Sequence, residues 1–168
     1  MGRHQKEQEE KKMAKVEKSI EVNLPVRTVY NQWTQFEEFP HFMEGVEAVR
    51  QLDDTHLRWK ASIAGKDEEW DAVITDQIPD KQVAWRSTSG AENSGIITFT
   101  PLGGDKTRVT AVIGYEPEGI VEKAGDALGV VGARVQGDLE RFKQFIEERG
   151  MATGAWRGEV QGGVETGA

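Results

Sequence analysis

Turn-forming residues recur about every ten positions through the middle of this chain, and that spacing limits the folds it can adopt. They fall at Asp53-Asp54, Gly65, Pro79-Asp80, 89–93 and 103–105. Regularly spaced turns of this kind are typical of an antiparallel meander, in which each strand pairs with the next. The sequence therefore predicts a run of six consecutive strands.

The segments between these turns alternate apolar and polar residues. Because successive side chains of a strand point to opposite faces, the alternation predicts a sheet with one apolar face and one solvated face. The acidic run 67–71 contributes Glu69 and Asp71 to the solvated face. The apolar face is predicted to carry Leu57, Trp59, Ala61, Ile63, Trp70, Ala72, Ile74, Val83, Trp85, Ile97, Phe99, Val109, Ala111, Ile113 and Tyr115.

Four aromatic residues recur every third position around a proline near the start of the chain. Pro40 has no amide hydrogen and disfavours helical geometry at the residue before it, so one continuous helix is excluded. The stretch instead predicts two short helical pieces, Val26 to Thr34 and Gln35 to Phe39, after a strand from Val16 to Asn23. The four aromatics are Trp33, Phe36, Phe39 and Phe42.

A long amphipathic helix is predicted after the last strand, ending at Gly150. Its first half contains several glycines, which weaken a helix by about 1 kcal/mol each relative to alanine. Either close approach of the helix to the sheet or easy local opening would explain them. The apolar stripe of this helix consists of Leu128, Val131, Val135, Leu139, Phe142, Phe145 and Ile146.

The 168 residues are enough for one domain with a sizeable core. Residues 1–13 are predicted to form a disordered extension, because they carry mixed charge and almost no apolar side chain. Residues 14–149 form the predicted domain. Residues 150–168 are rich in glycine and are predicted to be a flexible tail, although Trp156 is an aromatic that could dock.

Composition excludes several classes of function. A formal net charge of −8 argues against nucleic acid as a partner, because such binding depends on clustered lysine and arginine. With no cysteine, the chain has neither disulfides nor thiolate metal ligands. No apolar run is long enough to span a membrane, and we expect a cytoplasmic protein with no metal and no cofactor.

The predicted order is one strand, two short helices, six strands and a long helix. In this order of strands and helices, the chain resembles proteins of the START-like or SRPBCC superfamily, specifically its bacterial polyketide cyclase/dehydrase group. This resemblance implies an α+β helix-grip fold, in which a curved antiparallel sheet of about seven strands is closed by the C-terminal helix. The stretches that carry it are 22–29, 33–49, the 59–70 hairpin, 83–87, 93–95, 107–110 and 138–143.

The resemblance also implies a hydrophobic cavity for a lipid, quinone, polyketide or similar ligand, without a fixed chemistry. The tryptophans on the predicted inward face either fill the space between sheet and helix or line such a cavity. We favour the second interpretation. The candidate cavity residues are Trp33, Phe36, Phe39, Phe42, Trp59, Ile63, Trp70, Ile74, Trp85, Phe99, Ile113, Tyr115, Leu128, Val131 and Val135.

Few residues suggest catalysis, and no catalytic residue is predicted. Tyr30 and Tyr115 are interpreted as core aromatics, and His41, three residues before Glu44, as a surface residue beside the bend. We therefore expect a monomer or weak dimer that binds a hydrophobic small molecule without chemistry. The alternatives are a polyketide cyclase or aromatase-like enzyme and a partner-binding module that shields a lipid-like ligand.

Overall fold

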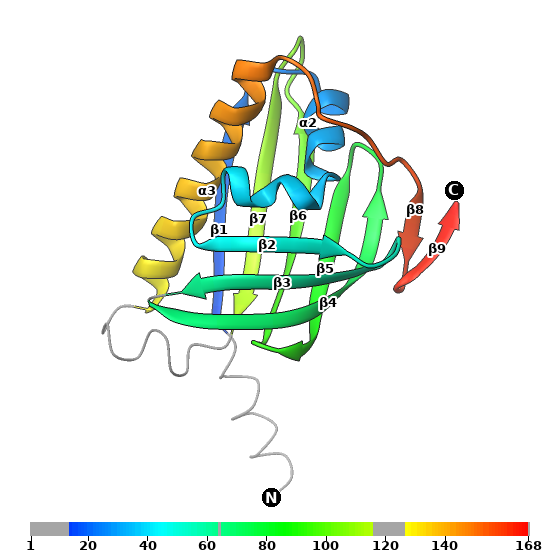
Figure 1. The fold of residues 1–168 in the computed structure, drawn as a ribbon. Helices are drawn as coiled ribbons and strands as arrows, with labels where there is room; N and C mark the ends of the chain where they lie inside the picture. Colours follow the sequence, from blue (N-terminus) through cyan, green and yellow to red (C-terminus); the bar gives the residue numbers. More distant parts are fainter. Residues whose placement is uncertain (1–13, 64, 116–126, 168) are drawn as a thin grey trace, which may run out of the picture.

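A strongly curved antiparallel sheet with one long helix across its concave side makes up the computed structural model, which describes residues 14–63, 65–115 and 127–167 (Figure 1). The predicted disorder of residues 1–13 lies outside these residues. The elements are β1 (Ala14–Val22), α2 (Val26–Trp33), η1 (Phe36–His41), β2 (Val46–Gln51), β3 (His56–Ile63), β4 (Lys66–Ile78), β5 (Gln82–Gly90), β6 (Asn93–Pro101), β7 (Thr107–Tyr115), α3 (Ala127–Arg149), β8 (Glu159–Gln161) and β9 (Val164–Gly167).

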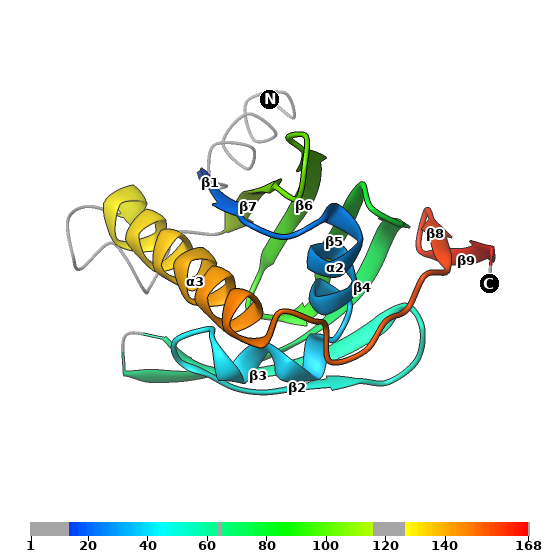
Figure 2. The same ribbon diagram turned by 90° about the horizontal axis from the view of Figure 1, so that it is seen from above.

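Seven strands form one continuous path in the order β1-β7-β6-β5-β4-β3-β2, and every pair along it is antiparallel. The predicted meander and helix-grip fold are confirmed. Seen from above, the sheet curves into a U whose arms are β1 with β7 and β2 with β3 (Figure 2). The helix α3 lies across the opening between the arms, while α2 sits nearer the closed side.

The bend after α2 differs from the one that the sequence predicted. Instead of ending at Phe39, the second helical piece is the 3₁₀ helix η1, which runs through Pro40. A 3₁₀ helix has φ near the value that the proline ring fixes, so proline fits it without distortion. The turn is closed by the amide of Phe42, which donates to the carbonyl of Phe39 at 3.1 Å.

Aromatic side chains from α2 and η1 fill the space between α3 and the sheet at one end of the molecule. Trp33 packs edge-on against Phe142 of α3, with ring centroids 4.9 Å apart, and Phe42 lies 5.2 Å from the same ring. Phe39 in turn lies 5.2 Å from Trp33. All four rings are buried, so this aromatic cluster joins both short helices to the C-terminal half of α3.

The predicted flexible tail is not what the structure shows for residues 151–167. Strand β4 is longer than β3, which pairs with it only from Lys66 to Val73. The tail strand β8 takes the free edge beyond that point, at Asp76 and Gln77, and then pairs with β9. Val160 of β8 is fully buried in the main core, so the tail is part of the domain.

Specific side-chain contacts fasten the same segment to α2. Gln32, buried in α2, accepts from the amide of Thr153 at 2.8 Å and donates to its hydroxyl at 3.1 Å. Arg157 donates to Asn31 at 2.6 Å, forms an ion pair with Asp80 at 2.8 Å and lies over the Tyr30 ring. The glycine-rich composition gives no sign of these contacts, because they are made by single residues far from their partners in the sequence.

One glycine in the first half of α3 lies close to the sheet. A side chain at Gly132 would place its Cβ 3.1 Å from Cε of Lys18 on β1, the end of a flexible side chain that a small shift would move away. This contact is compatible with both close packing and local opening as the reason for the glycine. Gly125 lies outside the described residues.

We predict that Phe142→Ala destabilises the fold by about 3 to 5 kcal/mol, because it empties the centre of the aromatic cluster. Chemical denaturation measures the loss. Val130→Ala is the control, since Val130 lies on the same helix but is exposed, and it should change stability by less than about 0.5 kcal/mol. Equal effects of the two substitutions would contradict the assigned helix face.

The tail gives a second prediction with a matched pair of valines in one hairpin. Val160→Ala should cost about 1 to 3 kcal/mol, because Val160 is fully buried, whereas Val164→Ala should be close to neutral, because Val164 is 63% exposed. Thermal or urea unfolding compares them. Indistinguishable midpoints for the two variants would show that the tail does not dock in solution.

Candidate functional site

A pocket of about 500 Å³ lies between the concave face of the sheet and residues 131–139 of α3. The helix contributes Val131, Val135 and Leu139, which recur on one face, together with Arg134 and Asp138 between them. Further along the helix, Phe142 is packed in the aromatic cluster and the pocket ends. The pocket thus occupies the part of the concave face that α2 and η1 leave free.

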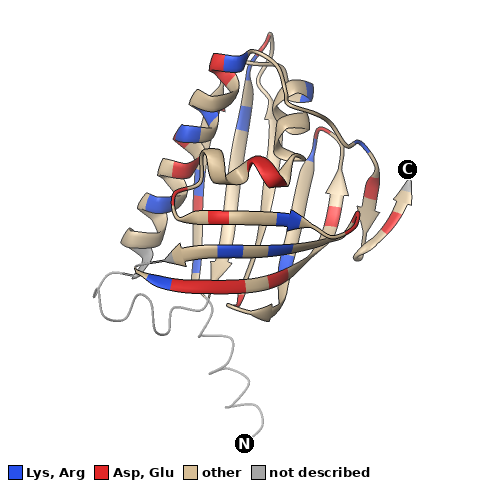
Figure 3. Cartoon of the chain, viewed as in Figure 1, with Lys and Arg blue, Asp and Glu red and all other residues tan. Residues whose placement is uncertain are grey.

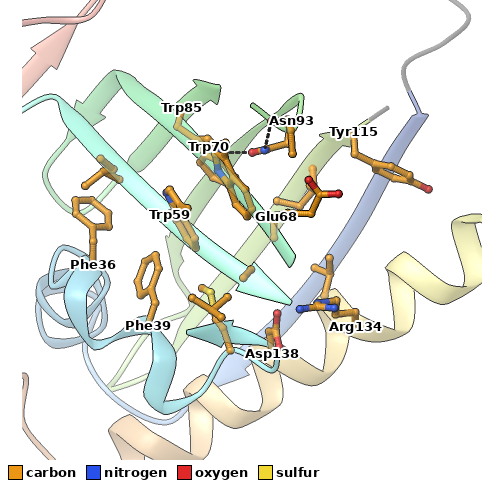
Figure 4. A pocket seen from close by; sticks show the side chains of 18 of the residues that line it. Phe36, Phe39, Trp59, Glu68, Trp70, Trp85, Asn93, Tyr115, Arg134 and Asp138 are labelled. Carbon is orange, nitrogen blue, oxygen red and sulfur yellow. Dashed lines mark hydrogen bonds between the residues drawn. The ribbon is translucent and has the colours of Figure 1, made fainter. Parts of the chain in front are cut away.

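Three tryptophans form one wall of the pocket. Trp59 and Trp70 are directly opposite each other on β3 and β4, and their rings stack with centroids 5.5 Å apart and planes 10° apart. Trp85 continues the wall on β5 and donates its indole N–H to Asn93 at 3.1 Å (Figure 4). The wall offers flat faces to a ring-containing molecule.

Gly95 makes room for this wall. A Cβ at this position would lie 2.5 Å from the Trp85 ring and 3.0 Å from Ile113 on the neighbouring strand. A side chain at this position would overlap the Trp85 ring, so glycine is the residue that fits here. The glycine therefore supports the shape of the pocket.

The two ends of the pocket differ in polarity. Phe36 and Phe39 of η1, with Met43, close one end with apolar side chains. Figure 4 shows Glu68 and Arg134 away from Phe36 and Phe39, whereas Asp138 on α3 lies between Arg134 and this end. The pocket therefore suits a molecule with an apolar body and a polar end.

Asp138 is the best-fixed polar group of the site. Its carboxylate accepts the amide of Glu44 at 3.0 Å and an N–H of Arg141 at 2.5 Å. Burial nevertheless raises the pKa of Asp138 above its usual value of 3.8, because the desolvation of the charged form outweighs these hydrogen bonds. Arg134, one turn away, donates to the carbonyl oxygen of Glu44.

Most of the predicted cavity residues come together here. Phe42 and Phe99 do not line the pocket: Phe42 packs against Phe142, and Phe99 lies beneath α2 with its ring 5.3 Å from Tyr30. The side chains of Ile63 and Leu128 are outside the described part of the chain. The predicted residues that do line the pocket are Trp33, Phe36, Phe39, Trp59, Trp70, Ile74, Trp85, Ile113, Tyr115, Val131 and Val135.

The sequence analysis missed the charged residues of the pocket, although the signals were present. Glu68 is two residues before Trp70 and therefore shares its face, but the acidic run around it was interpreted as solvated surface. Arg134 and Asp138 lie at helical spacing from Val131 and Val135. Counting only apolar residues in the stripe of α3 left both of them out.

Two other titratable residues lie away from the pocket. The His41 side chain is 63% exposed and pairs with Glu38 at 3.0 Å. Tyr30 is a fully buried residue of α2, and this burial raises its pKa to about 12. Neither residue lines the pocket beside the tryptophan wall.

In the part of the chain that the structure describes, no three histidine or acidic side chains are grouped as a metal site. Within those same ranges, no helix has the length and apolarity needed to cross a membrane.

Comparison with known sequences gives the family. A family model described as polyketide cyclase / dehydrase and lipid transport matches residues 22–144. A Streptomyces lincolnensis protein, described as an uncharacterised 17.2 kDa protein in the melC2-rnhH intergenic region, is 54% identical over 149 residues. The match covers 88% of this chain and 99% of that protein.

Comparison with solved structures identifies the fold. The Zhui aromatase/cyclase of a Streptomyces species superposes with a TM-score of 0.70 at 18% identity, covering 86% of this chain and 99% of that one. A START superfamily protein of Mycobacterium smegmatis gives a TM-score of 0.60 at 20% identity, covering 76% and 97%. Likeness at these identities shows the fold, which is the START-like helix-grip fold.

The family match extends over most of the domain, from the end of β1 to the second half of α3. The chain therefore belongs to the polyketide cyclase/dehydrase and lipid-transport family.

The raised pKa of Asp138 predicts a pH dependence of stability. Because the folded state holds this proton to higher pH than the unfolded state, the stabilising contribution is complete below pH 3.8 and is lost as pH rises through the raised pKa. Asp138→Asn cannot titrate, so its stability relative to wild type should increase over that rise. Urea midpoints measured from acidic to neutral pH test this, and a constant difference between the two proteins would contradict it.

Proposed function

We propose that this protein binds a hydrophobic, ring-containing small molecule in the pocket between the tryptophan wall and α3. The observation that carries the proposal is the pocket itself, about 500 Å³ with apolar and aromatic side chains over most of its lining. Pockets for drug-sized ligands typically have about 300 to 1,000 Å³ and a few oriented polar groups. Family membership supports the same class of ligand.

The proposal requires that the tryptophans do more than fill the core. Protein interiors are packed to high density, with few voids larger than a water molecule. The aromatic cluster around Phe142 follows this rule, whereas the space beside Trp59, Trp70 and Trp85 does not. A ligand that stacks on the wall would supply the missing contacts.

An enzyme of the aromatase/cyclase type is the second candidate, and Asp138 favours it. A carboxyl group whose pKa is raised by burial is suited to proton transfer to or from a bound poly-ketone. The structurally similar Streptomyces protein is an aromatase/cyclase. If this candidate is correct, Asp138→Asn should abolish turnover of such a substrate while leaving its binding intact.

We also propose that the protein acts in the cytoplasm as a monomer or weak dimer. The absence of cysteine suits a reducing compartment. Among the residues that the structure describes, the large exposed apolar side chains come from separate segments, at Leu52, Val130, Met151 and Val164.

Titration with pyrene tests the binding proposal. We expect saturable quenching of tryptophan emission in wild type, because a pyrene on the wall lies in contact with Trp59, Trp70 and Trp85. Trp70→Ala should weaken binding by about fivefold or more, since stacking of a flat ring on an aromatic side chain is typically worth about 1 to 3 kcal/mol. Emission spectra and isothermal titration calorimetry report the two effects.

Two variants serve as controls. Trp156→Phe changes a tryptophan packed on the core outside the pocket, and His41→Ala changes an exposed side chain, so both should bind like wild type. Wild type that shows no saturable response to pyrene or to any other apolar ring compound would refute the proposal.

A further inference from the structure

Glu68 is a carboxylate on a mostly apolar inward face, which Lys66, two residues before it, also lines. It lies on β4 at the start of the series Glu68, Trp70, Ala72 and Ile74, whose members line the pocket or the core. Its neighbours Asp67 and Glu69 are exposed, in a stretch of β4 that carries acidic residues almost continuously (Figure 3). The strand thus turns one carboxylate of the acidic run toward the pocket.

The protein leaves this carboxylate weakly paired. Its ion-pair partner within the described residues is Lys66, whose amino group lies 3.6 Å away and whose side chain is 67% exposed. That distance is too long for a hydrogen bond. The Glu68 side chain itself is 18% exposed, so a molecule in the pocket would remove much of its remaining water.

The other charged groups of the pocket are already matched or solvated. Arg134 donates to the carbonyl of Glu44, and its positive charge acts on the nearby carboxylate of Asp138. Asp138 is also held by Arg141 and the amide of Glu44. Glu92 is exposed in the turn between β5 and β6. With Lys66 and Arg134 as the cations, the lining has three carboxylates against two positive charges.

We propose that Glu68 selects the polar end of the ligand: the pocket takes ring compounds with a hydroxyl or amine donor and rejects those with a carboxylate. This specificity rests on the proposed binding function and adds the chemical class of the ligand. A donor placed beside Glu68 replaces the water that binding removes, whereas a carboxylate there faces a like charge at low dielectric. The apolar rings then extend along the tryptophan wall.

Three pyrene derivatives with the same ring system test the selectivity. At about pH 7.5 pyrenemethylamine is a cation, pyrenemethanol is neutral and pyrenecarboxylic acid is an anion. Dissociation constants measured by tryptophan quenching should place the amine and the alcohol at least about tenfold tighter than the acid on the wild-type protein. Unsubstituted pyrene measures binding to the wall alone.

Substitution of Glu68 identifies the residue responsible. Glu68→Gln keeps the shape and removes the charge, so the ratio of acid to amine affinity should shift by about tenfold toward the acid. Binding of unsubstituted pyrene should not change. Glu69→Gln is the matched control, because it makes the same change on the adjacent, 53% exposed side chain, and it should keep the wild-type ratio.

The outcomes separate this inference from the function on which it rests. One such outcome is that pyrene binds but wild type does not discriminate against the acid, and another is that pyrene binds but Glu68→Gln keeps the wild-type ratio. Either result refutes the role of Glu68 and leaves the proposed binding function intact. If none of the four compounds binds, the proposed function fails as well. If Glu68→Gln does not fold, the affinities of wild type for the amine and the acid test the selectivity, and equal affinities would refute it.

Discussion

The packing of Trp33 against Phe142 holds α3 away from the sheet along part of its length. Trp33 and the rings of η1 form a wedge between the helix and the concave face, and the centroid distance of 4.9 Å shows that the wedge is tight. The helix cannot move closer at this end. Toward residues 131–139 the wedge is absent, and the pocket lies there.

The C-terminal segment holds the wedge in place from the other side. Thr153 and Arg157 bind Gln32 and Asn31 of α2, and Val160 is buried beside β4. The helix α2 is therefore fixed between this segment and the sheet, which keeps Trp33 in position. A tail that sequence composition marks as flexible is in this way connected, through α2, to the apolar end of the pocket.

The sequence predicted what depends on local periodicity and turn chemistry. Alternation in the strands assigned Trp59, Trp70 and Trp85 to one face, and the structure places these three side chains in one wall. The prediction from sequence failed where the structure depends on single long-range contacts. The docking of Val160 follows from the unequal lengths of β3 and β4, and a local pattern carries no information about a free strand edge.

The polar end of the pocket was missed for a different reason. Glu68 and Asp138 lie at strand and helix spacings that place them with the apolar residues, but charged residues are mostly exposed, and that general rule outweighed the periodicity. Periodicity was the better guide at both positions. A charged residue in register with an apolar face is therefore a candidate for a site.

The proposed function requires that the space between the tryptophan wall and α3 receives an apolar ring compound. The indole N–H signals of the five tryptophans, followed by ¹H–¹⁵N NMR during titration with pyrenemethanol, test it most directly. Saturable shifts are expected for Trp59, Trp70 and Trp85, and none for Trp156. Shifts confined to Trp156, or equal small shifts at all five, would contradict it.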